Sequence, residues 1–451
     1  MSPIVLENLL LQLDPQVVWE TLTLRSGYNS TVVIVGTTLL GISAGVVGVF
    51  ALLRKRSLMA DALSHATLPG IGLAFIIATW LGYEGRSLPI LLTGAAITGV
   101  LGVVTIQWLV RSTRLREDAA IGIVLSVFFG IGVVILSIVQ SMKAGTAGGI
   151  NHFIYGQTAA MSAADAKLMG LIALATVFFA FFLLKEFAVV CFNDAFAQVT
   201  GWPVSKIDLL MMALVALVTV AGLQAVGLIL VVAMLIIPAV AARFWTERLW
   251  KLILLAGLIG GVSGYLGSVA SALLPRKPAG AVIVLTAGMI FTLSMFIAPS
   301  RGVLASVLRR MRLKLRIATD HLLEATVDED ESTRGSLSVA NTKVLQKKRN
   351  WGAWLHFAVP LFVRVKGFGR FEKGAFLASE VGLQRGLRVE RNHQLWEQYL
   401  LSYADIAPGH IDWTVDQVEH VLSPELINEL EILIQERTGE SFEIASRGGI
   451  A

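Results

Sequence analysis

An aspartate and a histidine lie four residues apart in the apolar segment Ser57 to Phe75, which reads SLMADALSHATLPGIGLAF. Residues at i and i+4 share one face of a helix, so the Asp61 carboxylate and the His65 imidazole can reach one divalent cation. Ionisable side chains inside a membrane are costly and usually line a polar pathway. The spacing indicates a metal site in such a pathway. In the simpler interpretation, Asp61 and His65 lie at the end of the helix. There they either cap the helix or form ion pairs with the basic residues 54–56.

The chain contains one cysteine, Cys191, which excludes an internal disulfide and any cysteine-rich zinc or iron–sulfur site. Metal binding would therefore rest on imidazole and carboxylate groups. A donor set without thiolate selects only weakly among Mn²⁺, Fe²⁺ and Zn²⁺.

A second group of residues of metal-ligand type lies near the end of the chain: His393, Glu397, Asp412, Asp416, Glu419 and His420. Asp416, Glu419 and His420 stand at i, i+3 and i+4 and share one face of a predicted helix that ends before Ser423 and Pro424. Together with His393 from another helix, they predict a site for Mn²⁺, Fe²⁺ or Zn²⁺. The alternative interpretation is a solvated acidic helix that carries one histidine.

Composition predicts the elements that would position these residues. The 451 residues are 55% hydrophobic and only 15% charged, with a mean hydropathy of +0.71, which favours a bilayer over water as the solvent. One crossing takes about 20 apolar residues. The sequence therefore predicts nine spans, with eight as the alternative, near residues 31–53, 58–82, 88–110, 119–141, 168–190, 208–224, 226–243, 251–274 and 280–298. In the first span, the spacing of Gly41 and Gly45 predicts close helix packing.

Basic residues follow the first, third, seventh and last spans, in groups that begin at Arg54, Arg111, Arg243 and Arg301. The positive-inside rule places these loops, and the tail after the last span, in the cytoplasm. The predicted location is thus the cytoplasmic (inner) membrane, with several passes and a cytoplasmic C-terminal region. A basic stretch, residues 306–325, is predicted to lie against anionic membrane lipid.

The segment Asn193 to Lys206, NDAFAQVTGWPVSK, is polar between two spans. A short helix closed by a Gly-x-Pro turn would suit docking onto a partner, and a plain connecting loop is the alternative.

Three stretches are similar to the metal-specific ABC permease family: SLMADALSHATLPGIGLAF, NDAFAQVTGWPVSKIDLL and GLQAVGLILVVAMLIIPAVAAR. The resemblance covers roughly residues 31–300. It implies a vitamin B12 permease-like fold, a second permease subunit as a homo- or heterodimer partner, a nucleotide-binding ATPase and an extracytoplasmic metal-binding protein. Asp61 and His65 fall at the metal positions of this family. Its coupling-helix positions fall at Asp194, Gln198, Gly201 and Pro203.

The sequence holds no Gly-x-x-x-x-Gly-Lys-Ser/Thr phosphate loop. We therefore expect a transport subunit and not an enzyme, with ATP hydrolysed by a separate partner and no permanently bound cofactor. The divalent transition metal is the substrate and a regulatory ligand. The alternative function is an ion-driven secondary metal transporter, or a channel, with a cytosolic metal sensor.

The segments RNHQLWEQYL and WTVDQVEHVLSPELINEL resemble the metal-binding and dimerisation region of the DtxR/MntR metalloregulators. This likeness implies metal ligands at His393, Asp416, Glu419 and His420, with Glu397 and Asp412 as ancillary positions. It also implies that His321 and Glu324, in IATDHLLEATV, are ligands from the first helix of that domain. Residues 336–386 match the winged helix-turn-helix only weakly, and the expected recognition helix around 351–360 is unusually apolar.

The expected architecture is an all-α polytopic membrane protein of eight to nine transmembrane helices, followed by a mainly helical cytosolic domain that resembles a DtxR-type winged-helix regulator. The predicted boundaries are 1–30 for an N-terminal segment, 31–300 for the permease, 301–338 for a basic juxtamembrane helix and linker, and 339–451 for the regulatory domain. This last domain either senses metal and limits transport in place, or acts as a metal-dependent repressor that binds nucleic acid.

Overall fold

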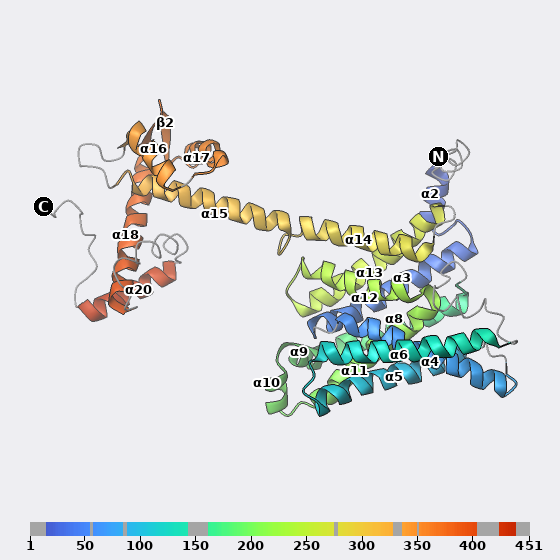
Figure 1. The fold of residues 1–451 in the computed structure, drawn as a ribbon. Helices are drawn as coiled ribbons and strands as arrows, with labels where there is room; N and C mark the ends of the chain where they lie inside the picture. The colour runs from blue at the N-terminus through green and yellow to red at the C-terminus, as the bar shows by residue number, and fades with distance from the viewer. Residues whose placement is uncertain are drawn as a thin grey trace. The chain divides into compact units, whose positions relative to one another are not determined.

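The fold is described from a computed structural model, which covers residues 15–54, 57–83, 88–142, 161–274, 278–327, 336–349, 351–403 and 424–438. The chain divides into two compact units, Met1–Ala305 and Ser306–Ala451 (Figure 1).

The first unit consists of helices throughout its described residues. They are α2 (Pro15–Leu22), α3 (Tyr28–Leu53), α4 (Ser57–Trp80), α5 (Leu88–Ser112), α6 (Glu117–Ser141), α8 (Ala163–Phe182), α9 (Leu184–Phe192), α10 (Asp194–Val199), α11 (Val204–Val226), α12 (Leu228–Arg243), α13 (Leu249–Leu273) and α14 (Ala279–Ile297). Within the part of the chain that the structure describes, eight of them are long and apolar enough to cross a membrane: α3, α4, α5, α6, α8, α11, α13 and α14. The protein is therefore a multi-pass membrane protein.

Two predicted spans differ from the helices observed. Helix α12 has 16 residues, about 24 Å at the rise of an α-helix, which is less than the hydrocarbon thickness of about 30 Å. It abuts α11 at Gly227, whose φ of +87° favours glycine because other side chains are strained there. The span predicted at 168–190 is divided between α8 and α9, with the break at Leu183.

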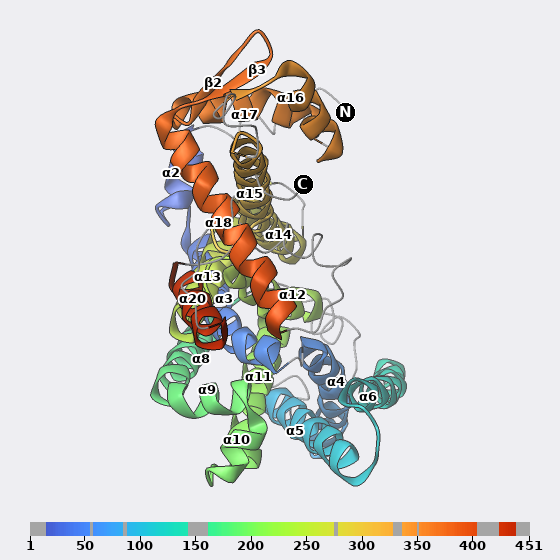
Figure 2. The ribbon, with the colours of Figure 1, turned by 90° about the vertical axis from the view of Figure 1, so that its left-hand side faces the viewer.

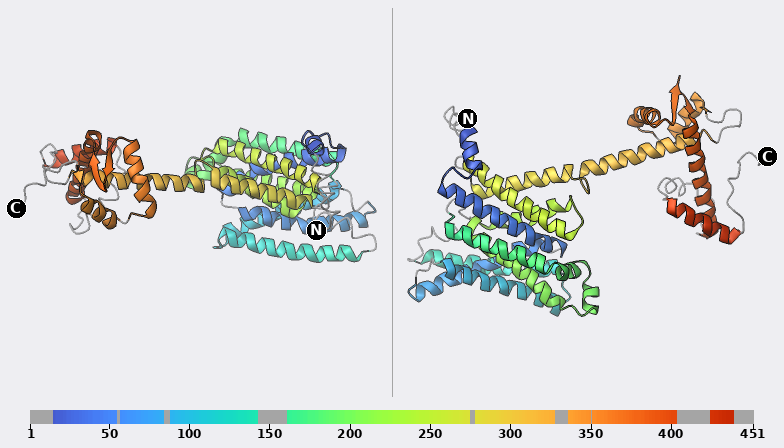
Figure 3. Two further views of the ribbon diagram at one scale, coloured as in Figure 1. Left: turned by 90° about the horizontal axis from the view of Figure 1, so that it is seen from above. Right: turned by 180° about the vertical axis from the view of Figure 1, so that it is seen from behind.

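Close helix packing organises the first unit. Helix α3 crosses α13 so closely that a Cβ atom on Gly41 would lie 2.2 Å from the carbonyl oxygen of Gly260, and one on Gly45 would lie 2.2 Å from that of Ala256. The packing predicted for these two glycines is thereby confirmed. Helix α4 packs against α5 and α6, while α11 contacts both α3 and the α4–α5 pair. The turquoise α6 lies at an edge of the unit (Figure 3).

The second unit contains α15 (Val303–Glu324), β1 (Ser336–Leu337), α16 (Val339–Lys348), α17 (Ala353–Val365), β2 (Gly369–Glu372), β3 (Ala375–Ala378), α18 (Glu380–Tyr403) and α20 (Pro424–Thr438). The three strands form an antiparallel sheet in the order β1-β3-β2. This succession from α15 to β3 is that of a winged helix, with β2–β3 as the wing beside α16 and α17 (Figure 2).

The winged helix forms although its sequence match is weak, because its buried positions keep the helical period. Leu355, Val359 and Val363, spaced by four along α17, are buried in one core with Leu322 of α15 and Phe376 of β3. Further apolar residues lie on the opposite face of α17, where Phe357 and Leu361 are exposed.

Candidate metal sites

The first candidate site lies on α4, a helix whose membrane-spanning part is largely enclosed by its neighbours. The Nε2 atom of His65 is 3.5 Å from Oδ1 of Asp61, and the side chains are 18% and 38% exposed. Two ligand atoms about 2.1 Å from one metal, at a tetrahedral angle, lie about 3.4 Å apart. The separation of the pair therefore suits one shared cation better than a direct hydrogen bond, which is usually about 2.7–3.2 Å long.

The surroundings of His65 fix its ring. The imidazole meets the edge of Phe129 on α6, with ring centroids 4.8 Å apart. Its Nδ1 atom is buried and has no hydrogen-bond partner among the described residues. The ring is thus oriented by packing rather than by hydrogen bonding, and it presents Nε2 toward Asp61.

The basic residue nearest in sequence whose position is described, Arg54, is engaged elsewhere. Its guanidinium donates to the Val190 carbonyl at 3.0 Å and to Asp194 at 2.5 Å, and its Nε lies 3.1 Å from the buried Asp208 carboxylate. Burial lowers the pKa of Arg54, but the hydrogen bond to Asp194 and the charge of Asp208 outweigh it, so the net pKa is raised. Arg54 therefore remains charged and ties the end of α3 to α9, α10 and α11. Lys55 and Arg56, the other two basic residues of that run, lie outside the described residues.

The segment predicted to couple to a partner forms the short helix α10. Asn193 caps it by accepting a hydrogen bond from the Phe196 amide at 3.0 Å, and Gly201, with a φ of +83°, follows its end. Phe196 and Val199 are 58% and 88% exposed, so the helix presents an apolar surface outside the helix bundle. Of the four predicted coupling residues, Asp194 contacts Arg54, while Gln198, Gly201 and Pro203 are exposed.

The second candidate site joins two helices of the C-terminal unit. Nδ1 of His393 on α18 lies 3.6 Å from Oε1 of Glu324 on α15, and each side chain is only 12% exposed. Asp320 accepts two hydrogen bonds from Arg385, at 2.7 and 3.1 Å, and a Cβ atom on Gly386 would lie 2.7 Å from the Leu323 carbonyl oxygen. This ion pair and this close approach set the register in which Glu324 faces His393. A buried imidazole and carboxylate form a donor set suited to Mn²⁺, Fe²⁺ or Zn²⁺.

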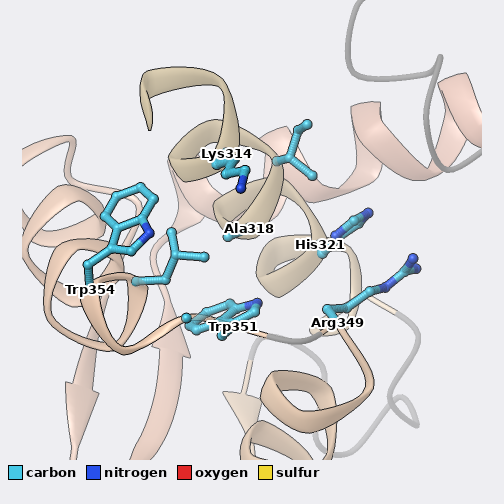
Figure 4. Close-up of a pocket in the computed structure, with 9 residues that line it drawn as sticks. Lys314, Ala318, His321, Arg349, Trp351 and Trp354 are labelled. Atoms are coloured by element: carbon cyan, nitrogen blue, oxygen red, sulfur yellow. The ribbon is translucent and has the colours of Figure 1, made fainter. Parts of the chain in front are cut away.

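His321 lies in a different environment. It is 6% exposed and lines a cavity of about 350 Å³ between α15 and the start of α17, with Lys314, Arg349, Trp351 and Trp354 (Figure 4). Two basic side chains in this cavity disfavour a further cation there. His321, one turn before Glu324 on α15, stays a predicted ligand.

The remaining predicted ligands are not placed by the structure. Asp412, Asp416, Glu419 and His420 lie outside the described residues, and Glu397 belongs to α18 but its side chain is not among those described. Among the described residues, no three histidine, cysteine, aspartate or glutamate side chains gather closely enough to hold a metal ion. The full ligand set of the regulatory site stays a prediction.

Sequence reasoning missed three buried carboxylates, one of which is Asp320, 3% exposed and paired with Arg385. Asp208 is 6% exposed, and the signal for it was an acidic residue within the apolar run of α11. Glu390 is 4% exposed, lies one turn before His393, and accepts a hydrogen bond from Gln394 at 2.6 Å. Its spacing of three residues from His393 was the available signal.

Residues 28–298 match the model of the ABC 3 transport family. The manganese transport system membrane protein MntC of Bacillus subtilis is 38% identical over 379 residues, which cover 84% of this chain and 86% of that protein. The chain belongs to the ABC 3 transport family. The zinc transport system membrane protein TroC of Treponema pallidum is 43% identical over 65% of this chain and 96% of its own length.

A solved structure and the C-terminal region also match. PsaBC from Streptococcus pneumoniae in complex with Fab matches with a TM-score of 0.53 and 32% identity over 62% of this chain and 95% of that chain. Residues 379–438 match the metal binding and dimerisation domain of iron dependent repressors. This member of the ABC 3 transport family therefore combines a permease with a domain of the DtxR type, as the sequence predicts.

Proposed function

We propose that this chain is the permease subunit of an ATP-driven importer that carries Mn²⁺, Fe²⁺ or Zn²⁺ across the cytoplasmic membrane. The observation that carries the proposal is the Asp61–His65 pair, whose facing atoms are 3.5 Å apart on a largely enclosed helix of an ABC 3 family member. The relatives named for manganese and zinc transport support the class of substrate. Asp61 and His65 bind the metal in transit, and a second permease subunit supplies further ligands.

Alternating access moves this site between the two sides of the membrane. Helix α10 docks onto the partner ATPase through its exposed residues Phe196 and Val199. Arg54 joins α10 to α3 and α11, and α11 contacts α4. Movement imposed on α10 by ATP binding thus has a packed route to Asp61 and His65. An extracytoplasmic metal-binding protein delivers the metal from the opposite side.

Metal uptake tests this site directly. Proteoliposomes with the assembled transporter and labelled Mn, Fe or Zn compare the wild type with Asp61→Ala and His65→Ala. Asp118→Ala serves as the matched control, because Asp118 is an exposed carboxylate in the first turn of another spanning helix, α6. Uptake of one metal should collapse in both site variants and persist in the control, with ATPase association unchanged in all. Unchanged uptake in the site variants would show that Asp61 and His65 have a structural role and do not bind the transported metal.

The competing function is an ion-driven transporter or a channel, and the presence of α10 argues against it. Such proteins have no ATPase to dock, whereas α10 exposes apolar side chains next to the charged pair Arg54–Asp194. Purification of the chain with its operon partners decides between the two. A stable complex with the ATPase, and uptake that the ATPase inhibitor vanadate stops, would support the importer. Uptake by this chain alone would exclude an ATP-driven importer.

The C-terminal unit is proposed to sense cytosolic metal through Glu324, His393 and the predicted ligands of the segment 412–420. The supporting observations are the buried pair on α15 and α18 and the repressor-type domain match. Uptake should fall when metal is loaded inside the vesicles, and His393→Ala should remove this inhibition while leaving uptake into empty vesicles intact. Inhibition that survives in His393→Ala would show that the pair does not sense metal.

A further inference from the structure

Helix α17, which occupies the recognition-helix position of the winged helix, is apolar on its outer face as well as its inner one. Phe357, Leu361 and Val365 follow one another at intervals of four residues and are 82%, 65% and 74% exposed. This row is named here the α17 stripe. A helix that is apolar all round is normally buried in protein or in a membrane, and nothing among the described residues of its own unit covers the stripe.

The α17 stripe is poorly suited to DNA. Base edges in the major groove are read by polar and charged side chains, and an apolar carbon there finds mainly the thymine methyl group. The stripe would therefore remove hydration from base edges without replacing their hydrogen bonds.

Basic side chains lie near both ends of α17. Lys314 and Arg349 line the cavity beside the start of α17, together with Trp351 and Trp354 (Figure 4). Arg364 and Lys366 are exposed at its other end. An apolar row that carries an aromatic residue and is bordered by basic side chains has the chemistry of a helix that lies in the interface of an anionic membrane.

The second unit is covalently joined to the membrane unit. Helix α15 begins at Val303, shortly after the last spanning helix ends at Ile297, and its 22 residues extend about 33 Å. This covalent connection gives the bilayer surface a high effective concentration at the second unit.

We propose that the α17 stripe inserts into the interface of the anionic lipid bilayer, and that the cavity lined by Lys314 and Arg349 receives a lipid phosphate group. The recognition helix of this unit then serves as a membrane contact. This inference needs only that the chain spans a membrane, so it stands or fails independently of which metal is transported.

Spin labels on the full chain in nanodiscs test the proposal. In a Cys191→Ala background that retains metal uptake, a nitroxide is attached to Leu361→Cys or, as the matched control, to Val344→Cys on α16. Val344 is an apolar residue of the same unit with a similar exposure of 64%. Power saturation then measures the access of oxygen, which partitions into lipid, and of a nickel chelate, which stays in water.

In nanodiscs with phosphatidylglycerol, the label at position 361 should gain access to oxygen and lose access to nickel, while the label at 344 stays in water. Arg364→Ser with Lys366→Ser, or phosphatidylcholine alone, should shift the 361 label back toward water. Equal nickel access at both positions in the anionic nanodisc would overturn the proposal. A 361 label shielded from both reagents in either lipid would overturn it in favour of a protein partner or second copy, and protection only by added duplex DNA would overturn it in favour of a nucleic acid.

Discussion

The two candidate metal sites place similar donors at similar distances by different means. In the membrane unit, Asp61 and His65 are one turn apart on one helix, with 3.5 Å between their facing atoms. In the C-terminal unit, Glu324 and His393 come from different helices and are 3.6 Å apart. The membrane pair is also the more open, because Asp61 is 38% exposed while both residues of the second pair are 12% exposed.

This difference corresponds to two tasks. A pair on one helix keeps its spacing whatever its neighbours do, so surrounding helices can move to open the site on either side without dismantling it. A pair that joins two helices is coupled to their packing, so that metal binding stabilises that packing. The first arrangement suits release of a transported ion, and the second suits sensing.

The largest expected effect comes from removing one donor of the membrane pair, and exchanging the two donors tests whether the pair is a local site. Loss of one donor should lower uptake by about 10–100-fold or more, since even outer-shell changes at metal sites have effects of that size. The double variant Asp61→His with His65→Asp keeps a carboxylate and an imidazole one turn apart, so it should recover much of the uptake lost in His65→Ala.

The corresponding exchange in the tail, Glu324→His with His393→Glu, should not restore inhibition by internal metal, because both side chains are packed between α15 and α18. Uptake of labelled metal into empty and metal-loaded vesicles measures both cases. The exchange in the membrane pair should restore uptake, and the exchange in the tail should not restore inhibition. Equal recovery in both would contradict the distinction between a site formed within one helix and a site formed by the packing of two helices.

Arg54→Met should destabilise the membrane unit by about 3–5 kcal/mol, because it leaves the buried Asp208 carboxylate without its ion pair. Thermal unfolding in detergent measures the change. Arg301→Met is the matched control, since Arg301 pairs with Glu247 where both side chains are about half exposed or more and such pairs contribute only about 0–1 kcal/mol. Equal shifts for the two variants would show that Arg54 acts as a surface charge.

Metal should stabilise the C-terminal unit by about 2.7 kcal/mol at a concentration one hundred times the dissociation constant. Hydrogen exchange of α15 and α18 in the full chain reports this as slower exchange on addition of Mn²⁺. His393→Ala should abolish the protection and His356→Ala, at an exposed histidine of the same unit, should retain it. Protection that persists in His393→Ala would place the metal elsewhere.

The smallest expected effect is that of Gly45→Ala, which should destabilise the α3–α13 contact by about 1–3 kcal/mol through overpacking. The added methyl group would meet the Ala256 carbonyl oxygen at 2.2 Å unless the helices separate. Gly122→Ala on α6 has open space around it and provides the control. The two unfolding midpoints in detergent should therefore differ, and equal midpoints would mean that the α3–α13 contact adjusts without cost.

Sequence reasoning was strongest where a feature depends on neighbours along one helix. Apolar length predicted the long spanning helices and, as its alternative, the count of eight found among the described residues, but it missed the break between α8 and α9. Whether a short apolar run continues or bends depends on local backbone at Gly227 and Leu183. The sequence indicated the winged helix only weakly. The buried residues of α17 recur every four positions, but apolar residues on its outer face hide this pattern in the sequence.

The sequence by itself determined that the chain spans a membrane, that Asp61 and His65 share a helical face, and that a short polar segment separates two spans. These features follow from residue type and the fixed geometry of an α-helix. Only the tertiary structure decided that Arg54 links α3 to Asp194 and Asp208, that Glu324 meets His393, and that the α17 stripe is exposed. Each of these depends on which helices pack together and in what register, and spacing along the chain does not encode that.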